Sequence, residues 1–234
     1  MVRFVKVACV SLGLVIAASG NAAFARQDEG TSLRSKFTAP APNQPAADLY
    51  GKSLPPIGYV DFCARGENEC QFSGGKNQRL KVTTAQWNLI TSVNATVNAT
   101  IEPVSAPQQY HLLQYWNYPV SGGDCNSYTL LKKRYLQELG IAPEMLLLTV
   151  VLTETDEGHL VLTIPTENGD YILDNRRSEI LRWDETGYIF LKRQSQETAK
   201  EWVSLQKASP AVAVTTRSRS LFSTLLNFGA RAKP

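Results

Sequence analysis

Several features that would assign this chain to a familiar class of protein are scarce or missing. Beyond residue 25 no stretch approaches 18 consecutive apolar residues, so the sequence predicts no transmembrane helix there. No stripe of basic residues interleaved with aromatics runs through the body of the chain, and the formal net charge is only +3. Binding of nucleic acid is therefore not expected. No internal repeat is visible in the sequence.

What is present is the composition of a globular protein with a distinct beginning. Of the 234 residues, 43% are hydrophobic and 19% are charged, which suits one domain with tails or at most two small domains. Arg3 and Lys6 precede an uncharged apolar run, residues 7–19, that is too short to span a bilayer comfortably. The small-x-small sequence ending at Ala25 predicts a signal peptide cleaved near Ala25 and export to the periplasm. A retained membrane anchor is the competing interpretation.

The composition divides the chain into four segments. Residues 1–25 are the predicted signal peptide, and residues 26–57 are a Pro/Ala-rich lead-in that cannot bury enough apolar surface to fold alone. The ordered domain is expected over residues 58–205. The basic tail, 206–234, holds no acidic residue. It is interpreted either as a disordered tail or as a segment that docks to a partner or to an anionic membrane surface.

The chain has only 4 cysteines, and export changes how they are counted. Cys9 leaves with the signal peptide. Cys63 and Cys70 are near enough to close a small loop in an oxidising compartment, so we predict a disulfide between them. A metal-binding pair is not expected, because neither CxxC spacing nor a nearby histidine is present. Cys125 is left over as a partner for another chain, an inert buried thiol or a reactive nucleophile.

Hydrophobic periodicity predicts helices first and strands afterwards. Apolar residues recur at steps of three and four residues over 84–101 and over 125–139, as amphipathic helices require. The period then becomes that of strands, and Asn168-Gly169 is a turn signal between two of them. The predicted strands cover residues 145–153, 159–164, 171–174 and 188–193. Helices followed by an antiparallel sheet define an α+β domain.

Cys125 falls where a thiol can be activated. Gly122, Gly123 and Asp124 permit a close approach of the backbone, and the cysteine begins the second predicted helix. Unpaired N–H groups and the helix dipole at that position favour negative charge, so we expect a thiolate with a lowered pKa. The same N–H groups are candidates for binding a developing oxyanion. A buried, inert cysteine is the alternative.

The predicted hairpin supplies a base and an acceptor for that thiol. The chain has only 2 histidines; His111 lies in an aromatic loop, and His159 opens a strand. Imidazole accepts a proton near neutral pH, and its other nitrogen needs an orienting acceptor. Asp174 ends the next strand, and counting back from the turn places it within about two residues of opposite His159. We therefore predict a catalytic triad of Cys125, His159 and Asp174.

These residues lie in a set of motifs that spans residues 58–203. The motifs are Phe62-Cys63-Ala-Arg with Cys70, Tyr115-Trp116 with Pro119, Gly-Asp-Cys125, Leu-Gly-Ile141, Gly-His159-Leu-Val-Leu and Tyr-Ile-Leu-Asp174-Asn. Together they resemble the bacterial transglutaminase-like cysteine proteinase family. The resemblance implies a papain/transglutaminase-like α+β fold with N-terminal helices packed on an antiparallel β-sheet, a periplasmic location and the same triad. Trp116 and Asp124 become candidates for contacts to the substrate or the oxyanion, with a buried loop anchor as the alternative for Trp116.

One motif departs from the pattern of the family. Better-known relatives carry Asp-Cys-Glu-Asp around the nucleophile, and the acidic residues beside the cysteine hold calcium. Here Asn126 and Ser127 follow Cys125, and the loss of carboxylate ligands lowers the affinity for calcium. We expect that no cofactor is required, with calcium as an open alternative and no other metal.

The resemblance also suggests partners. Better-known relatives trim a large surface adhesin, release cells from a biofilm and are restrained by an inner-membrane receptor for cyclic di-GMP. For this chain it implies a protein substrate, with a surface adhesin as one candidate, and an inner-membrane regulatory receptor.

The predicted reaction is that of a cysteine endopeptidase. His159 takes the proton of Cys125, the thiolate attacks a peptide carbonyl, and water resolves the thioester. A transglutaminase or another acyl transferase would use the same residues, with an amine in place of water. A non-catalytic periplasmic binding module with the same fold is the alternative from a different class.

Overall fold

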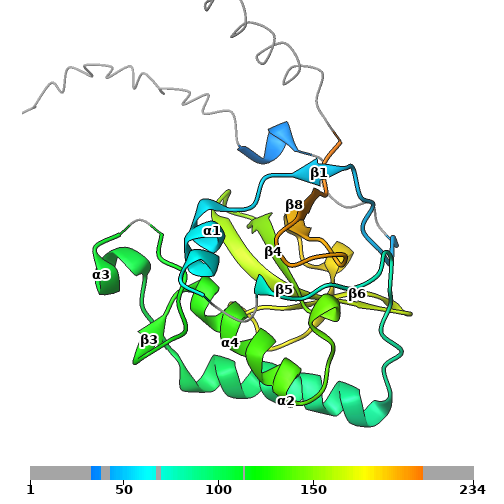
Figure 1. The fold of residues 1–234 in the computed structure, drawn as a ribbon, viewed down its shortest axis with the longest axis horizontal. Coiled ribbons are helices and arrows are strands. Elements are labelled where there is room, and N and C mark those ends of the chain that lie inside the picture. Colours follow the sequence, from blue (N-terminus) through cyan, green and yellow to red (C-terminus); the bar gives the residue numbers. More distant parts are fainter. Residues whose placement is uncertain (1–32, 38–42, 67–69, 113, 208–234) are drawn as a thin grey trace, which may run out of the picture. The chain divides into compact units, whose positions relative to one another are not determined.

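A seven-stranded antiparallel sheet forms the centre of the fold (Figure 1). The computed structural model of the chain describes residues 33–37, 43–66, 70–112 and 114–207. The strand order is β1-β9-β8-β4-β5-β6-β7. The strands are β1 (Lys52–Ser53), β4 (Leu147–Leu152), β5 (Gly158–Thr166), β6 (Gly169–Leu173), β7 (Leu181–Arg182), β8 (Ile189–Gln194) and β9 (Trp202–Ser204). The predicted signal peptide and the tail beyond residue 207 lie outside the described residues.

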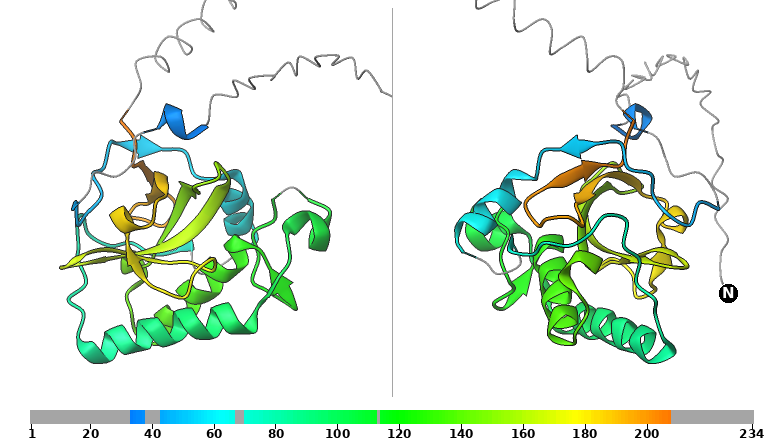
Figure 2. Two further views of the ribbon diagram at one scale, coloured as in Figure 1. Left: turned by 180° about the vertical axis from the view of Figure 1, so that it is seen from behind. Right: turned by 45° about the vertical axis from the view of Figure 1, so that its right-hand side comes forward.

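The α-helices of the described residues precede the central strands in the chain. They are α1 (Ile57–Ala64), α2 (Thr84–Thr100), α3 (Ala106–Tyr110) and α4 (Cys125–Glu138). The remaining elements are a parallel ribbon of β2 (Glu102–Pro103) and β3 (Gly122–Gly123) and the 3-10 helices Leu33–Lys36, Pro143–Met145 and Trp183–Glu185. Helix α4 packs against β5 and α2 packs against α4, so the long helices lie on one side of the sheet (Figure 1 and Figure 2). The predicted α+β class is confirmed.

Helix α2 begins and packs as its sequence predicts. Its first turn is closed by a capping box, in which the Gln86 backbone N–H donates to Thr83 Oγ1 and the Thr83 N–H donates to Gln86 Oε1. The apolar residues that recur along the helix face the core, where they are fully or nearly buried: Ile90, Val93 and Val97.

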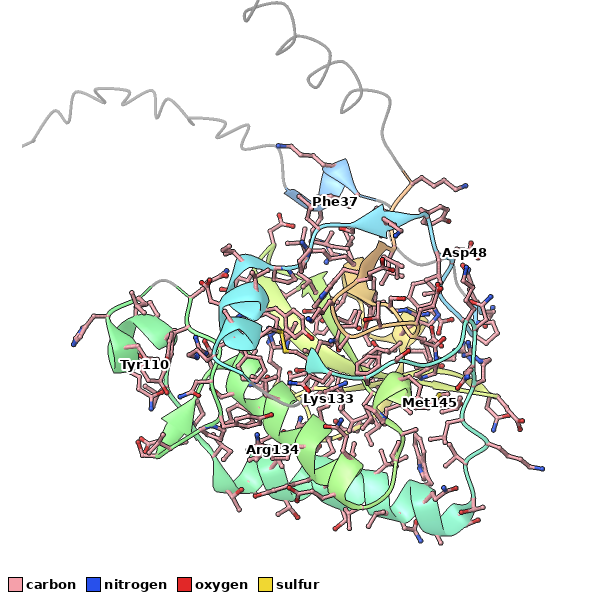
Figure 3. All side chains as sticks on the ribbon, viewed as in Figure 1. Phe37, Asp48, Tyr110, Lys133, Arg134 and Met145 are labelled. Atoms are coloured by element: carbon pink, nitrogen blue, oxygen red, sulfur yellow. A yellow bond between two sulfur atoms is a disulfide. The ribbon has the colours of Figure 1, made fainter. Side chains whose placement is uncertain are left out.

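Helix α4 also ends where the sequence predicts. Gly140 follows it at φ +89°, a left-handed conformation that glycine adopts without the strain of a side chain. The side chain of Lys133 is labelled in Figure 3. Its ammonium donates to the carbonyl oxygen of Pro143 at 3.1 Å and to the carbonyl of Leu146. These bonds tie α4 to the turn that leads into β4, and thereby fix the helix that starts at Cys125.

Strands β5 and β6 form the hairpin predicted around Asn168-Gly169. Leu162 pairs with Leu173 in the ladder. Continuing that register by one residue places Asp174 two residues from opposite His159. The predicted neighbourhood of these two residues in the hairpin is therefore confirmed.

Apolar side chains are buried on both faces of the sheet. One cluster fills the space between the helices and the sheet and includes Trp202, while a second lies around Val151, Val161 and Phe190 and includes Trp183. Burial on both faces explains why β4 and β5 have nearly continuous apolar sequences.

The ordered chain begins earlier than the sequence predicts. The sequence places its start near Gly58, with residues 26–57 as an extended lead-in. In the structure, β1 lies within that segment and pairs with β9. The Asp170 N–H donates to the Pro45 carbonyl at 2.7 Å, and the Ala47 N–H donates to Asp170 Oδ2 at 3.1 Å. Backbone hydrogen bonds hold this part of the chain, and hydrophobic periodicity does not report them.

Cys63 and Cys70 form a disulfide with their Cα atoms 5.6 Å apart, which confirms the predicted pairing. The bond joins the end of α1 to the segment leading to α2. Cys125 is the free cysteine of the described residues. None of the helices in this part of the chain is long and apolar enough to cross a membrane.

Candidate active site

Asp124 caps α4 and determines which backbone groups are free at its start. Its Oδ1 accepts hydrogen bonds from the backbone N–H of Asn126 at 3.0 Å and of Ser127 at 3.3 Å. Its Oδ2 accepts from the side-chain amide of Asn126 at 3.2 Å. Cys125 is the first residue of the helix, as predicted. Two N–H groups that were candidates for binding an oxyanion are thus occupied by the capping carboxylate.

Cys125 holds its proton at neutral pH. The residue keeps some exposure to solvent, yet burial raises the pKa of its thiol to about 12, and the negative charges of Asp124 and Asp174 act in the same direction. Backbone N–H groups of Leu160 and Asn126 oppose this shift. The prediction of a lowered pKa is therefore wrong, because desolvation and two carboxylates outweigh the donors at the helix start.

His159 and Asp174 are joined by a buried hydrogen bond. His159 Nε2 lies 2.8 Å from Asp174 Oδ1. A carboxylate only accepts, so Nε2 carries the hydrogen and Nδ1 is left with a lone pair. The described residues show no hydrogen bond between Cys125 and His159; the sulfur instead meets the N–H of Leu160, the residue after His159. The fold thus joins the His159 imidazole to the Asp174 carboxylate and places the thiol of Cys125 beside the start of β5.

Asp174 accepts hydrogen bonds at both of its carboxylate oxygens. Oδ1 also accepts from the Arg176 N–H at 3.0 Å, and Oδ2 accepts from the Tyr188 hydroxyl at 2.6 Å. Burial acts to raise the pKa of Asp174, but the hydrogen bond and charge of His159, together with those two donors, lower it to about 2. The carboxylate is therefore ionised throughout the physiological pH range.

Tyr188 is a residue of this site that sequence reasoning missed. Its hydroxyl donates to Asp174 and accepts from Arg177 Nη2 at 3.3 Å, and Arg177 in turn donates to Glu154 at 2.9 Å. Its ring meets the imidazole of His159 edge-on, with centroids 5.9 Å apart. A tyrosine at the start of a strand has the same sequence pattern as a core residue, so only the fold reveals its contacts.

Helix α2 supports the loop that carries Asp174. Asn98 Nδ2 donates to the carbonyl oxygens of Asp174 at 2.8 Å and of Arg177 at 3.1 Å. Asn94, one turn earlier on the same face, donates to the carbonyl of Ser178 at 3.1 Å. These side chains fasten the acid-bearing loop to a rigid helix. No sequence signal distinguishes them from surface asparagines.

Trp116 is a buried anchor of the loop before α4. It is 3% exposed, and its ring centroid lies 5.7 Å from that of Tyr59. A Cβ atom added at Gly58 would lie 2.4 Å from the Trp116 ring, so the ring packs directly on the backbone of α1. Its carbonyl accepts from Arg65. Of its two expected roles, these contacts favour the loop anchor.

The described residues around Cys125 form no visible group of metal ligands. Within the described ranges, no three His, Cys, Asp or Glu side chains are grouped so that they could hold a metal ion. The carboxylate of Asp124 accepts from N–H groups of Asn126 and Ser127. Calcium takes about 6–8 oxygen ligands, whereas Asn126 turns its amide nitrogen, a donor, toward that carboxylate.

A cysteine at the start of a helix, beside a hairpin that joins an imidazole to a buried carboxylate, is typical of thiol enzymes of the papain and transglutaminase type. The family model described as bacterial transglutaminase-like cysteine proteinase matches residues 49–210. This chain belongs to that family and is a transglutaminase-like cysteine protease.

Solved structures of LapG from Legionella pneumophila are similar to the chain. Calcium-bound LapG is 22% identical with a TM-score of 0.45, and the alignment covers 59% of this chain and 82% of LapG. A second LapG structure gives 23% identity, a TM-score of 0.44 and coverages of 58% and 77%. EGTA-treated LapG is 24% identical with a TM-score of 0.43, and the alignment covers 56% of this chain and 78% of LapG. No curated protein matches the chain.

Proposed function

We propose that this protein is a periplasmic cysteine endopeptidase that cleaves a protein substrate through Cys125, His159 and Asp174. The observation that carries the proposal is the buried hydrogen bond between His159 Nε2 and Asp174 Oδ1 at the start of β5, where the free thiol lies. The periplasmic location rests on the signal-like sequence of residues 1–25.

The reaction begins with transfer of the thiol proton to His159. Nε2 is held by Asp174, so Nδ1 is the nitrogen with a free lone pair. Because the pKa of Cys125 is raised to about 12, the thiolate does not accumulate beforehand, and proton transfer accompanies attack on the peptide carbonyl. The imidazole and thiol come into direct contact when substrate binds, since such hydrogen bonds are often long in the free enzyme.

The remaining steps return every group to its starting state. Attack forms a carbon–sulfur bond, and the imidazolium gives its proton to the departing amine as the carbon–nitrogen bond breaks. Water then attacks the thioester, with His159 accepting a proton from it and returning one to the sulfur. The ionised Asp174 stabilises the imidazolium in both halves of the reaction.

The test compares the two histidines of the chain. Purified wild type, Cys125→Ala, His159→Asn and His111→Asn are incubated with unfolded casein, and new chain ends are counted by mass spectrometry. Asparagine tolerates the positive φ of His111, so that variant is the matched control. We expect cleavage by wild type and His111→Asn only.

A second arm separates hydrolysis from acyl transfer. The same mixtures contain a fluorescent primary amine as the probe. Incorporation of the amine into glutamine side chains without chain cleavage would show that the protein is a transglutaminase and would contradict the peptidase proposal. If wild type neither cleaves casein nor incorporates the amine, a binding module is favoured.

A further inference from the structure

Tyr188 is held rigidly next to the proposed triad. It lies immediately before β8 and is 1% exposed. Gly187, at φ +75°, turns the chain just before it, and the Tyr188 N–H donates to Thr186 Oγ1 at 3.1 Å. Its ring packs in the second core cluster with Trp183 and Phe190. The side chain therefore has no freedom to move its hydroxyl away from the acid.

The direction of the hydrogen bonds at this hydroxyl is determined by its neighbours. Arg177 Nη2 can only donate, so the Tyr188 oxygen accepts from it at 3.3 Å. The hydroxyl hydrogen is then left for Asp174 Oδ2, 2.6 Å away. A bond from a neutral hydroxyl to an ionised carboxylate is among the stronger hydrogen bonds of proteins.

The two oxygens of Asp174 have separate tasks. Oδ1 faces His159, and Oδ2 faces Tyr188. Without the hydroxyl, Oδ2 would lose its donor at 2.6 Å and keep the Arg177 side chain, whose Nε is 3.8 Å away. Loss of a close donor to a buried carboxylate oxygen is costly, so the carboxylate would no longer be fixed in its position beside His159.

Tyr188 also contacts the base itself. Its ring stands at 79° to the His159 imidazole, with centroids 5.9 Å apart. An edge-to-face contact of this kind resists rotation of either ring. One residue thus touches both the imidazole and the acid that orients it.

We propose that Tyr188 is a positioning residue of the active site, which fixes the Asp174 carboxylate through its hydroxyl and the His159 imidazole through its ring. The inference deepens the proposed function and rests on it, since positioning matters only if His159 is the base. Tyr188 touches no reacting atom, so its effect passes through Asp174 and His159.

The test is Tyr188→Phe, which keeps the ring and removes the hydroxyl. Tyr59→Phe is the matched control, because Tyr59 is also 1% exposed and donates through its hydroxyl to the Ala199 carbonyl at 2.9 Å. We expect casein cleavage by Tyr188→Phe to fall about tenfold in kcat with KM unchanged, since one hydrogen bond to a charged group is lost. Tyr59→Phe should keep the kcat of wild type even if both variants lose stability to urea.

A pH profile distinguishes positioning from a structural role. The profile is the titration of Asp174 itself. Loss of the hydroxyl removes one of the bonds that lower the pKa of this carboxyl, so that pKa should be higher in Tyr188→Phe than in wild type and unchanged in Tyr59→Phe. Arg177→Met, at a partly exposed position, is the second variant if Tyr188→Phe does not fold. Without the guanidinium, the hydroxyl hydrogen of Tyr188 can rotate away from Asp174. We expect kcat to fall in this variant too, but by less than in Tyr188→Phe.

The outcomes separate the two proposals. The carboxyl carbon of Asp174 is titrated by NMR in wild type and Tyr188→Phe, which needs no activity. An unchanged Asp174 titration together with an unchanged kcat overturns the positioning role. Full activity of His159→Asn overturns the proposed function, whatever Tyr188→Phe does.

Discussion

His159 Nε2 and Asp174 Oδ1 lie 2.8 Å apart, and the two residues come from the same hairpin. The register of β5 and β6 brings them together, and the side-chain amide of Asn98 in α2 donates a hydrogen bond to the backbone carbonyl of Asp174. The pair is therefore a product of the fold itself and does not depend on a bound substrate.

Asp174→Asn should abolish most activity without unfolding the protein. The Arg176 N–H and the Tyr188 hydroxyl both donate to this side chain, so they compete with His159 for the single oxygen of an amide. His159 is then offered the amide nitrogen and takes the wrong tautomer, and we expect kcat to fall about 10²- to 10⁴-fold. The measurement is casein cleavage, with Asp184→Asn as a control that breaks an ion pair with Arg182 elsewhere. Equal activity of the two variants would contradict the role of Asp174.

The same carboxylate should make stability fall in strong acid. The pKa of Asp174 is lowered from 3.8 to about 2 in the folded state, so the folded protein releases this proton more readily than the unfolded chain. The stabilisation is complete above the unfolded pKa and is lost as the pH falls through the folded one, which amounts to about 2 kcal/mol. Urea unfolding between pH 5 and pH 2 should show this loss in wild type and not in Asp174→Asn. If the free energy of unfolding fell equally with pH in both proteins, the loss of stability would not come from Asp174.

Asp124→Asn should make Cys125 more acidic. The negative charge of Asp124 acts with burial to raise the pKa of the thiol to about 12, and asparagine removes the charge while remaining a good helix cap. The readout is the thiolate absorbance during an alkaline titration, with Asp61→Asn on the exposed side of α1 as the control. A wild-type thiol that titrates at its ordinary pKa of 9.0 would refute the account of its burial.

The sequence predicts the elements whose signals are local. Both long helices, the central strands and the β5–β6 hairpin follow from periodicity, a glycine stop and an Asn-Gly turn. The neighbourhood of His159 and Asp174 follows too, because hairpin register can be counted from the turn. The strands β1, β7 and β9 are two or three residues long, too short for a period to be visible.

The features missed at the site depend on distant contacts. Tyr188, immediately before β8, and Asn98 of α2 reach Asp174 from distant parts of the chain, and no spacing in the sequence connects them. The pKa of Cys125 was predicted in the wrong direction because the helix start is visible in sequence, whereas the burial of the sulfur is not. Local patterns thus place Cys125 at the start of a helix but do not report the environment of its sulfur.

Removal of calcium should leave the reactivity of Cys125 unchanged. The carboxylate of Asp124 is engaged by N–H groups, and Asn126 contributes a donor where a calcium ion needs oxygen. We expect the same iodoacetamide rate and the same melting temperature with millimolar calcium and after dialysis against EGTA. A melting temperature that rises with calcium and falls after EGTA would show a site that these residues do not explain.

Gly58→Ala should destabilise the protein although alanine is the better helix former. Gly58 lies in α1, where the exchange would stabilise an exposed position by about 1 kcal/mol. The added Cβ would instead lie 2.4 Å from Cδ1 and 2.6 Å from Nε1 of Trp116. Because Trp116 is buried and cannot yield freely, we expect a loss of about 1–3 kcal/mol in the free energy of unfolding. Gly158→Ala, where no atom lies within 4 Å of the new Cβ, is the control and should change stability much less. If urea unfolding gave Gly58→Ala the stability of wild type, Trp116 would have to turn away at little cost, and it would not anchor the loop that leads to Cys125.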